Sequence, residues 1–259
     1  ATATTDNAVV LGTNSFVHGD SSIAIGHGAT VNSDKPGISS NSIAFGTNAK
    51  VKGGNSTAIG WLADTGDGAG MLAVGEGAST NNKTAGSATY SANNSQSVAL
   101  GSRAQAWGDQ AIALGNDVKA SGNSSVAIGG DDIQSVRTAH GTLYQNITGQ
   151  ALPGTASPGT TLPNSEVFIS TEASGAGSTA IGVMTTASGH FASALGMTAD
   201  ASGDGAVAIG PVAKSSGEAG VAIGIASQAS AKKTTAMGSV AKATGENATA
   251  IGGWANAAN

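Results

Sequence analysis

The sequence predicts an all-β fold, a parallel β-solenoid built from short coils, and three observations support this prediction. Runs of the form hydrophobic–Ala–hydrophobic–Gly recur along the chain, most of them at intervals of 14 residues. Apolar side chains alternate within each run, which is the periodicity of a β-strand. Glycine accounts for 40 of the 259 residues. A glycine about every seven residues would break any helix repeatedly, so strands and turns are favoured.

The repeat is regular enough to define the architecture. Fourteen such runs are present, with Thr or Ser in place of the first hydrophobic residue in some of them. The runs are Val9–Gly12, Ile23–Gly26, Ile43–Gly46, Thr57–Gly60, Leu72–Gly75, Val98–Gly101, Ile112–Gly115, Val126–Gly129, Thr179–Gly182, Ser193–Gly196, Val207–Gly210, Val221–Gly224, Thr235–Gly238 and Thr249–Gly252. Nine of the 13 intervals between final glycines are 14 residues; the others are 20, 15, 26 and 53. A fixed period of this kind is typical of solenoids.

Each unit also has a second half, in which two small residues alternate with polar ones before another glycine, as in Ala104–Gly108 and Ala241–Gly245. A unit therefore predicts two short strands, each followed by a turn in which glycine reaches positive φ without steric cost. Successive units then stack as coils and pair in parallel, about 4.8 Å apart.

The two faces of the strands must serve different purposes. We expect the paired Val and Ile side chains to fill the narrow interior, with these representatives: Val126, Ile128, Val207, Ile209, Val221 and Ile223. The intervening alanines would then form a flat apolar stripe that contacts other copies of the chain, for example Ala113, Ala127, Ala208 and Ala222. A large exposed apolar stripe is rare on a monomer, so this face predicts an oligomer. The reversed assignment of the two faces is the alternative.

Three segments carry a family resemblance: NSSVAIGG at Asn123–Gly130, DGAVAIG at Asp204–Gly210 and NATAIGG at Asn247–Gly253. They resemble the YadA-like head repeats of trimeric autotransporter adhesins of Gram-negative bacteria. The resemblance implies a homotrimer of left-handed parallel β-rolls at the cell surface, anchored in the outer membrane through a C-terminal region outside this chain. It also implies adhesion to host matrix proteins such as collagen, fibronectin or laminin, or to host cell receptors. A structural spacer rod that projects a binding tip is the alternative function.

The interval of 53 residues divides the chain into three predicted parts: head repeats at 1–129, an insert at 130–177, and further head repeats at 178–259. The insert opens with Gly-Gly-Asp-Asp and resembles the head-insert motif of such adhesins. Its candidate ligand-binding or inter-chain residues are Asp131, Asp132, Arg137, His140, Tyr144 and Phe168. The alternative is a structural flap that covers a coil edge or clasps a neighbouring chain. The shorter insertions Asn32–Ser40 and Thr80–Asn94 are polar and predict surface loops.

No residue pattern predicts catalysis, a cofactor or a metal. The chain has no cysteine, its four histidines lack metal-ligand spacing, and Asp131-Asp132 alone falls short of the 6–8 oxygens that Ca²⁺ requires. A net charge of −5 argues against a nucleic-acid partner. No run approaches the roughly 20 apolar residues of a membrane helix. An enzyme on a β-helix would need an acid–base cluster, and an ice-binding solenoid would need rows of threonine; neither pattern is present.

Overall fold

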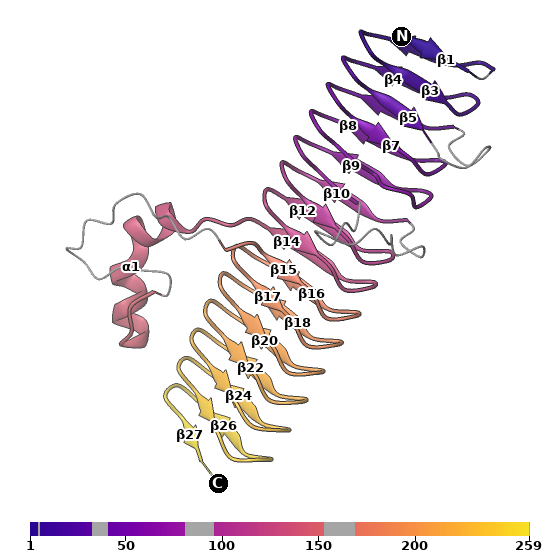
Figure 1. Ribbon diagram of the computed structural model, residues 1–259. Helices are drawn as coiled ribbons and strands as arrows, with labels where there is room; N and C mark the ends of the chain where they lie inside the picture. Colours follow the sequence, from indigo (N-terminus) through magenta and orange to yellow (C-terminus); the bar gives the residue numbers. More distant parts are fainter. Residues whose placement is uncertain (5, 33–40, 81–95, 153–168, 259) are drawn as a thin grey trace. The chain divides into compact units, whose positions relative to one another are not determined.

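The chain winds as a β-solenoid with parallel sheets on two faces, and most coils contribute one strand to each face (Figure 1). The computed structural model describes residues 1–4, 6–32, 41–80, 96–152 and 169–258. The chain divides into two compact units, residues 1–127 and 128–259. The all-β parallel solenoid predicted from the sequence is confirmed. Most of the two shorter insertions lies outside the described residues.

In the first unit, one sheet has the strand order β2-β4-β6-β8-β9-β10-β12. We call it the first sheet. The second sheet contains β1-β3-β5-β7 and β11-β13, with isolated bridges at Asp64 and Ser79 between the two groups. The bounds are β1 Thr2–Ala3, β2 Val9–Leu11, β3 Phe16–His18, β4 Ile23–Ile25, β5 Thr30–Asn32, β6 Ile43–Phe45, β7 Lys50–Val51, β8 Thr57–Ile59, β9 Leu72–Val74, β10 Val98–Leu100, β11 Gln105–Ala106, β12 Ile112–Gly115 and β13 Lys119–Ala120. Strand β14, Val126–Gly129, spans the boundary between the units.

The second unit repeats this arrangement and adds a helix. Its first sheet has the order β16-β18-β20-β22-β24-β26, and its second sheet has the order β15-β17-β19-β21-β23-β25-β27. The bounds are α1 Gln134–Thr148, β15 Glu172–Ala173, β16 Thr179–Ile181, β17 Thr186–Ala187, β18 Ser193–Leu195, β19 Asp200–Ala201, β20 Val207–Ile209, β21 Lys214–Ser215, β22 Val221–Ile223, β23 Gln228–Ala229, β24 Thr235–Met237, β25 Lys242–Ala243, β26 Thr249–Ile251 and β27 Asn256–Ala257.

The strand register stacks equivalent residues of successive coils on one another. Ala208 of β20 lies opposite Ala222 of β22, which in turn lies opposite Ala236 of β24. Each partner is 14 positions further along the chain. Side chains of one kind therefore form rows that run across the strands, and each row has one position in every coil. All side chains of one row lie on the same face of the sheet, so a whole row is either interior or exposed.

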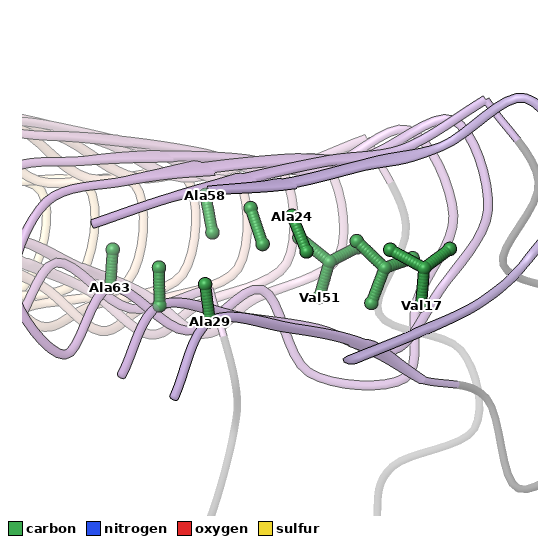
Figure 2. Packing of buried hydrophobic residues seen from close by; sticks show 9 residues of the cluster. Val17, Ala24, Ala29, Val51, Ala58 and Ala63 are labelled. Carbon is green, nitrogen blue, oxygen red and sulfur yellow. The ribbon is translucent and has the colours of Figure 1, made fainter. Parts of the chain in front are cut away.

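The interior between the two sheets is filled mainly by alanine. In the first unit, Ala24 and Ala58 of the first sheet point toward Ala29 and Ala63 on the opposite side, as Figure 2 shows. Valines of the second sheet, including Val17 and Val51, complete this cluster (Figure 2). In the second unit the corresponding cluster consists entirely of alanines, from Ala222 to Ala250. The described members of both clusters are 0–3% exposed.

The predicted assignment of the two faces is therefore wrong. The alanines expected to contact other copies are all 0% exposed and lie inside their own chain: Ala113, Ala127, Ala208 and Ala222. The residues expected to fill the interior are only partly buried and lie on the outer face: Val126, Ile128, Val207, Ile209, Val221 and Ile223. The physical reason is space, because the two layers of so short a coil approach closely enough that only methyl-sized side chains fit between the first-sheet strands and the opposite wall.

The glycine that ends each first-sheet strand is required by its backbone geometry. Gly210 has a φ of +124°, and a Cβ placed there would lie 2.8 Å from the carbonyl carbon and oxygen of Gly224 in the next coil. Any larger residue would combine an unfavourable φ with a clash against backbone. The repeated glycine is thus explained by the spacing of the coils.

Candidate functional site

The outer face of the first sheet carries the main apolar surface of the chain. Every described strand of this sheet has a large apolar residue at its third position, directly before the terminal glycine. These residues form what we call the third-position row: Leu11, Ile25, Phe45, Ile59, Val74, Leu100 and Leu114 in the first unit, Ile128, Ile181, Leu195, Ile209, Ile223, Met237 and Ile251 in the second. Several are strongly exposed, with Leu11 at 63% and Phe45 at 50%. Monomeric soluble proteins rarely expose so extended an apolar surface.

The other outward position of the same strands is not kept apolar. In the second unit it is occupied by Thr179, Ser193, Thr235 and Thr249 as well as by two valines. The third-position row is therefore the part of this face in which a large apolar side chain is present in every coil. Because its apolar side chains are regularly spaced on a pleated surface, the outer face of the first sheet is suited to contact another sheet.

The long insertion leaves a coil and returns to the same place. The hydroxyl oxygen of Thr171 lies within hydrogen-bond distance of the carbonyl oxygens of Gly130, at 2.8 Å, and Gly182, at 2.6 Å, and shares its one proton between them. The chain resumes the coil in β15, which pairs with β17. The interruption therefore covers residues 131–169, which we call the insertion. Residues 172–177, predicted to belong to the insert, lie in a coil.

Helix α1 is the main described element of the insertion, and it packs on the second unit. Tyr144 from the helix, Ile133 just before it and Leu152 after it form a buried cluster with turn residues of the solenoid. The turn residues of this cluster are Met184, Ala226 and Val240, with Val183, Met197, Val212 and Ile225 partly buried against them. At the far end, Gly149 ends the helix in the left-handed conformation, and a Cβ there would lie 3.2 Å from the Trp254 ring.

The length of the helix matches the surface beneath it. Fifteen residues of α-helix extend about 22 Å at 1.5 Å per residue. The five coil steps from Met184 to Trp254 extend about 24 Å at 4.8 Å per step. The helix thus covers the turns of the second unit from its first complete coil to its last described one.

These turns differ between the two units, and this difference is the signal that sequence reasoning missed. The residue two positions after the strand glycine has a positive φ in every described coil except that of β14, where the insertion begins. In the first unit this position mostly holds Asn, Asp or Gly, which tolerate the left-handed conformation, although Leu62 and Arg103 occur there as well. In the second unit it holds Met184, Val212 and Val240, at φ of 56–59°. A valine is unfavourable in this conformation, so its presence is explained by the apolar contact with α1.

The predicted insert residues are not gathered into one site. Asp132 is exposed, and its Oδ1 accepts a hydrogen bond of 2.6 Å from the backbone N–H of Gln134, the first residue of α1. Asp131 and Arg137 are half-buried, and His140 is exposed on the helix. Phe168 lies outside the described residues. Asp132 therefore has a clear structural role at the start of the helix, and binding by this group of residues stays a prediction.

Among the predicted insert residues that the structure describes, Tyr144 is the most buried, with 6% of its surface exposed. It lies between α1 and the solenoid, where burial raises the pKa of its phenol above the ordinary value of 10.0. A side chain in this position holds the helix against the coils and is shielded from a ligand in solvent.

The described residues offer neither a metal site nor a membrane-spanning helix. Within those ranges, no group of three or more His, Asp or Glu side chains is placed to hold a metal ion. Among the helices of the same ranges, none has the length and apolar character needed to cross a membrane. The features that remain are the third-position row and the helix-covered turns.

Comparison with known families identifies the repeat. The model of the YadA head domain repeat matches residues 1–15, 18–35, 39–63, 92–117, 119–131, 173–199, 201–227, 215–241, 229–253 and 243–259. The chain belongs to the YadA head family. This confirms the resemblance predicted from the sequence, to the head of a trimeric autotransporter adhesin. YadA heads are structural adhesin domains, so the chain is placed among adhesin-type proteins of the bacterial cell surface. A comparison with curated proteins found no match.

Proposed function

We propose that this chain is the non-catalytic head of a homotrimeric adhesin that attaches a Gram-negative bacterium to host extracellular matrix or host cells. Its chains would form left-handed β-rolls of 14-residue coils, held together through the first sheet. A C-terminal region outside this chain would anchor the protein in the outer membrane. The observation that carries the proposal is the third-position row, since it is apolar in every described coil and each of its members is at least partly exposed on a single chain.

The row supports association because covering it removes a large apolar area from water. Each square ångström of apolar surface buried contributes about 25 cal/mol. Leu195, Met237 and Ile251 are each more than two fifths exposed, and equivalent residues recur in each coil. Repeated coils on three chains would also present the same weak binding surface many times, and multivalency of this kind raises avidity by about 10²–10⁴ over a single site.

Binding to immobilised collagen, fibronectin and laminin tests the attachment function. We expect the wild-type chain to bind at least one of them and to lose avidity in the variant Ile223→Glu, which places a charge in the third-position row. Gln228→Glu, which adds the same single charge at a partly exposed position of the second sheet, is the matched control and should leave assembly intact. Wild-type protein that assembles but binds no matrix protein or host cell would favour the alternative function, a structural spacer rod.

A further inference from the structure

Helix α1 has a wider apolar face than the solenoid covers. Its buried side comprises Tyr144 and Thr148, in line with Ile133 just before the helix. Three further apolar side chains remain exposed: Val136 at 42%, Leu143 at 57% and Ile147 at 43%. We call these three residues the α1 stripe. The helix carries a single formally charged residue, Arg137, so nothing in its composition offsets this exposed apolar area.

The α1 stripe is a continuous feature of the helix rather than scattered residues. Spacings of seven and four residues place Val136, Leu143 and Ile147 within about 40° of one another on a helix that turns about 100° per residue. The centre of the stripe lies about a quarter turn from the buried side. Exposed His140 lies at the edge of the stripe, between it and the buried side, and the rest of the helix surface is mostly polar, with Gln134, Ser135, Thr138, Thr142, Gln145 and Asn146. The uncovered apolar area therefore flanks the solenoid contact.

The position of the helix identifies what covers the stripe. The turns beneath α1 begin directly after the third-position row: Ile209 belongs to the row, Gly210 ends the strand, and Val212 contacts the helix cluster. The turns that α1 covers are therefore directly adjacent, along the chain, to the row through which copies are proposed to associate. We propose that the α1 stripe packs against a second copy of this chain, so that each insertion joins two chains. This inference rests on the association of copies through the third-position row proposed above.

The dimensions fit such a contact. The stripe extends about 16 Å over 11 residues of helix. That length covers slightly more than three coils of a neighbouring copy at about 4.8 Å per coil. The neighbour offers uncharged, aliphatic side chains at this spacing, and the stripe has no charge that would oppose them.

The absence of cysteine from the chain makes a site-specific test possible. Leu143→Cys and, as the matched control, Thr142→Cys would each be labelled with a photo-activated crosslinker in the otherwise unchanged chain. Both side chains are exposed on a single chain, but Thr142 lies on the polar side of the helix. We expect Leu143→Cys to give covalently linked pairs of chains that Thr142→Cys lacks.

The outcomes separate this inference from the proposed function. A wild-type chain that is monomeric in solution would overturn both. A wild-type oligomer in which Leu143→Cys links only to its own chain, for example to residues 153–168, would overturn the inference and leave the proposed function standing. As a second measurement, Leu143→Lys combined with Ile147→Lys should preserve the coils, shown by an unchanged circular dichroism spectrum, and lower the melting temperature of the oligomer. An unchanged melting temperature would contradict the contact.

Discussion

At the scale of single residues, the fold depends on which side chains are small enough for the interior. Ala222 is 0% exposed and faces the opposite wall of its coil, whereas its neighbour Val221 points outward. Close packing on the inside leaves no room for added methyl groups. The outer face has no such limit, so the same substitution should have different effects at adjacent positions.

We therefore expect Ala222→Leu to destabilise the second unit strongly. Overpacking a filled core costs about 1–3 kcal/mol, and the effect should be at the upper end here because the displaced atoms belong to paired strands. Val221→Leu is the control, since its side chain lies on the outer face of the same strand. Thermal unfolding followed by circular dichroism would compare them. Equal melting temperatures for the two variants would show that the interior has been wrongly assigned.

The terminal glycines give a second prediction at this scale. Gly210→Ala should cost several kcal/mol, because its Cβ would lie 2.8 Å from backbone atoms of Gly224 at a φ of +124°. Gly205→Ala is the matched control: its φ is +64°, and no atom lies within 4 Å of the added Cβ. The left-handed conformation alone costs a non-glycine residue about 1–2 kcal/mol. Urea denaturation should rank the two variants in that order, and the reverse ranking would contradict the proposed role of coil spacing.

At the scale of elements, α1 is stabilised by what it covers. Gly141 and several β-branched residues lower the intrinsic tendency of this segment to form a helix. The N-cap residue, Ile133, has no side-chain group that could accept a hydrogen bond from the first turn. A helix of this length is marginal on its own. Its stability must therefore come from the contact between Tyr144 and the apolar turns of the second unit.

The ionisation of Tyr144 tests this contact. Burial raises the pKa of its phenol above 10.0 in the folded state, so the folded state favours the neutral form. The stabilisation is fully present below pH 10 and is lost as the pH rises through the folded pKa. We expect α1 to loosen in that alkaline range in the wild-type chain but not in Tyr144→Phe. Phenolate absorbance measured in Tyr90→Phe, which leaves Tyr144 as the sole tyrosine, should titrate above pH 10.

A midpoint at the ordinary value of a free tyrosine would show that Tyr144 is not buried in solution. The same result in both the intact chain and a denatured sample would contradict the docking of α1 on the turns.

Removing the insertion gives the complementary test. Deletion of residues 131–169 restores a 14-residue interval between Gly129 and Gly182, and the coil should still close because Thr171 already bonds to Gly130. We expect the deletion to expose the apolar turns and to promote aggregation. Asn at positions 184, 212 and 240, as found in turns of the first unit, should restore solubility. Dynamic light scattering would measure this. A deletion variant as soluble as the wild-type chain would contradict the covering role of α1.

The sequence predicted the coils well, because their backbone requirements leave direct marks. A strand such as Val207–Ile209 alternates with period two, and Gly210 must end it. Which face of the strand is interior could not be deduced from that alternation, because period two defines two faces without ranking them. The ranking depends on the space between the sheets, which admits Ala208 and excludes Ile209. Helix α1 was not predicted either, because its stability comes from distant turns rather than from its own residues.

At the scale of the whole molecule, the third-position row links fold and function. Exposed ion pairs such as Lys232–Glu218, with an Nζ–Oε2 distance of 2.8 Å, connect neighbouring coils at the surface and contribute little to stability. The apolar row is different, because it remains uncovered in a single chain while recurring in every coil. A head that displays repeated surface on associated chains can bind through many weak contacts.

The most direct test of this account is the mass of the wild-type chain in solution, measured by light scattering at low and high salt. We predict a stable particle with three times the 24.7 kDa mass of one chain. Its mass should not fall as salt is raised, because apolar contacts are not screened. A stable particle of 24.7 kDa would contradict the account, since the third-position row would then be exposed without a partner.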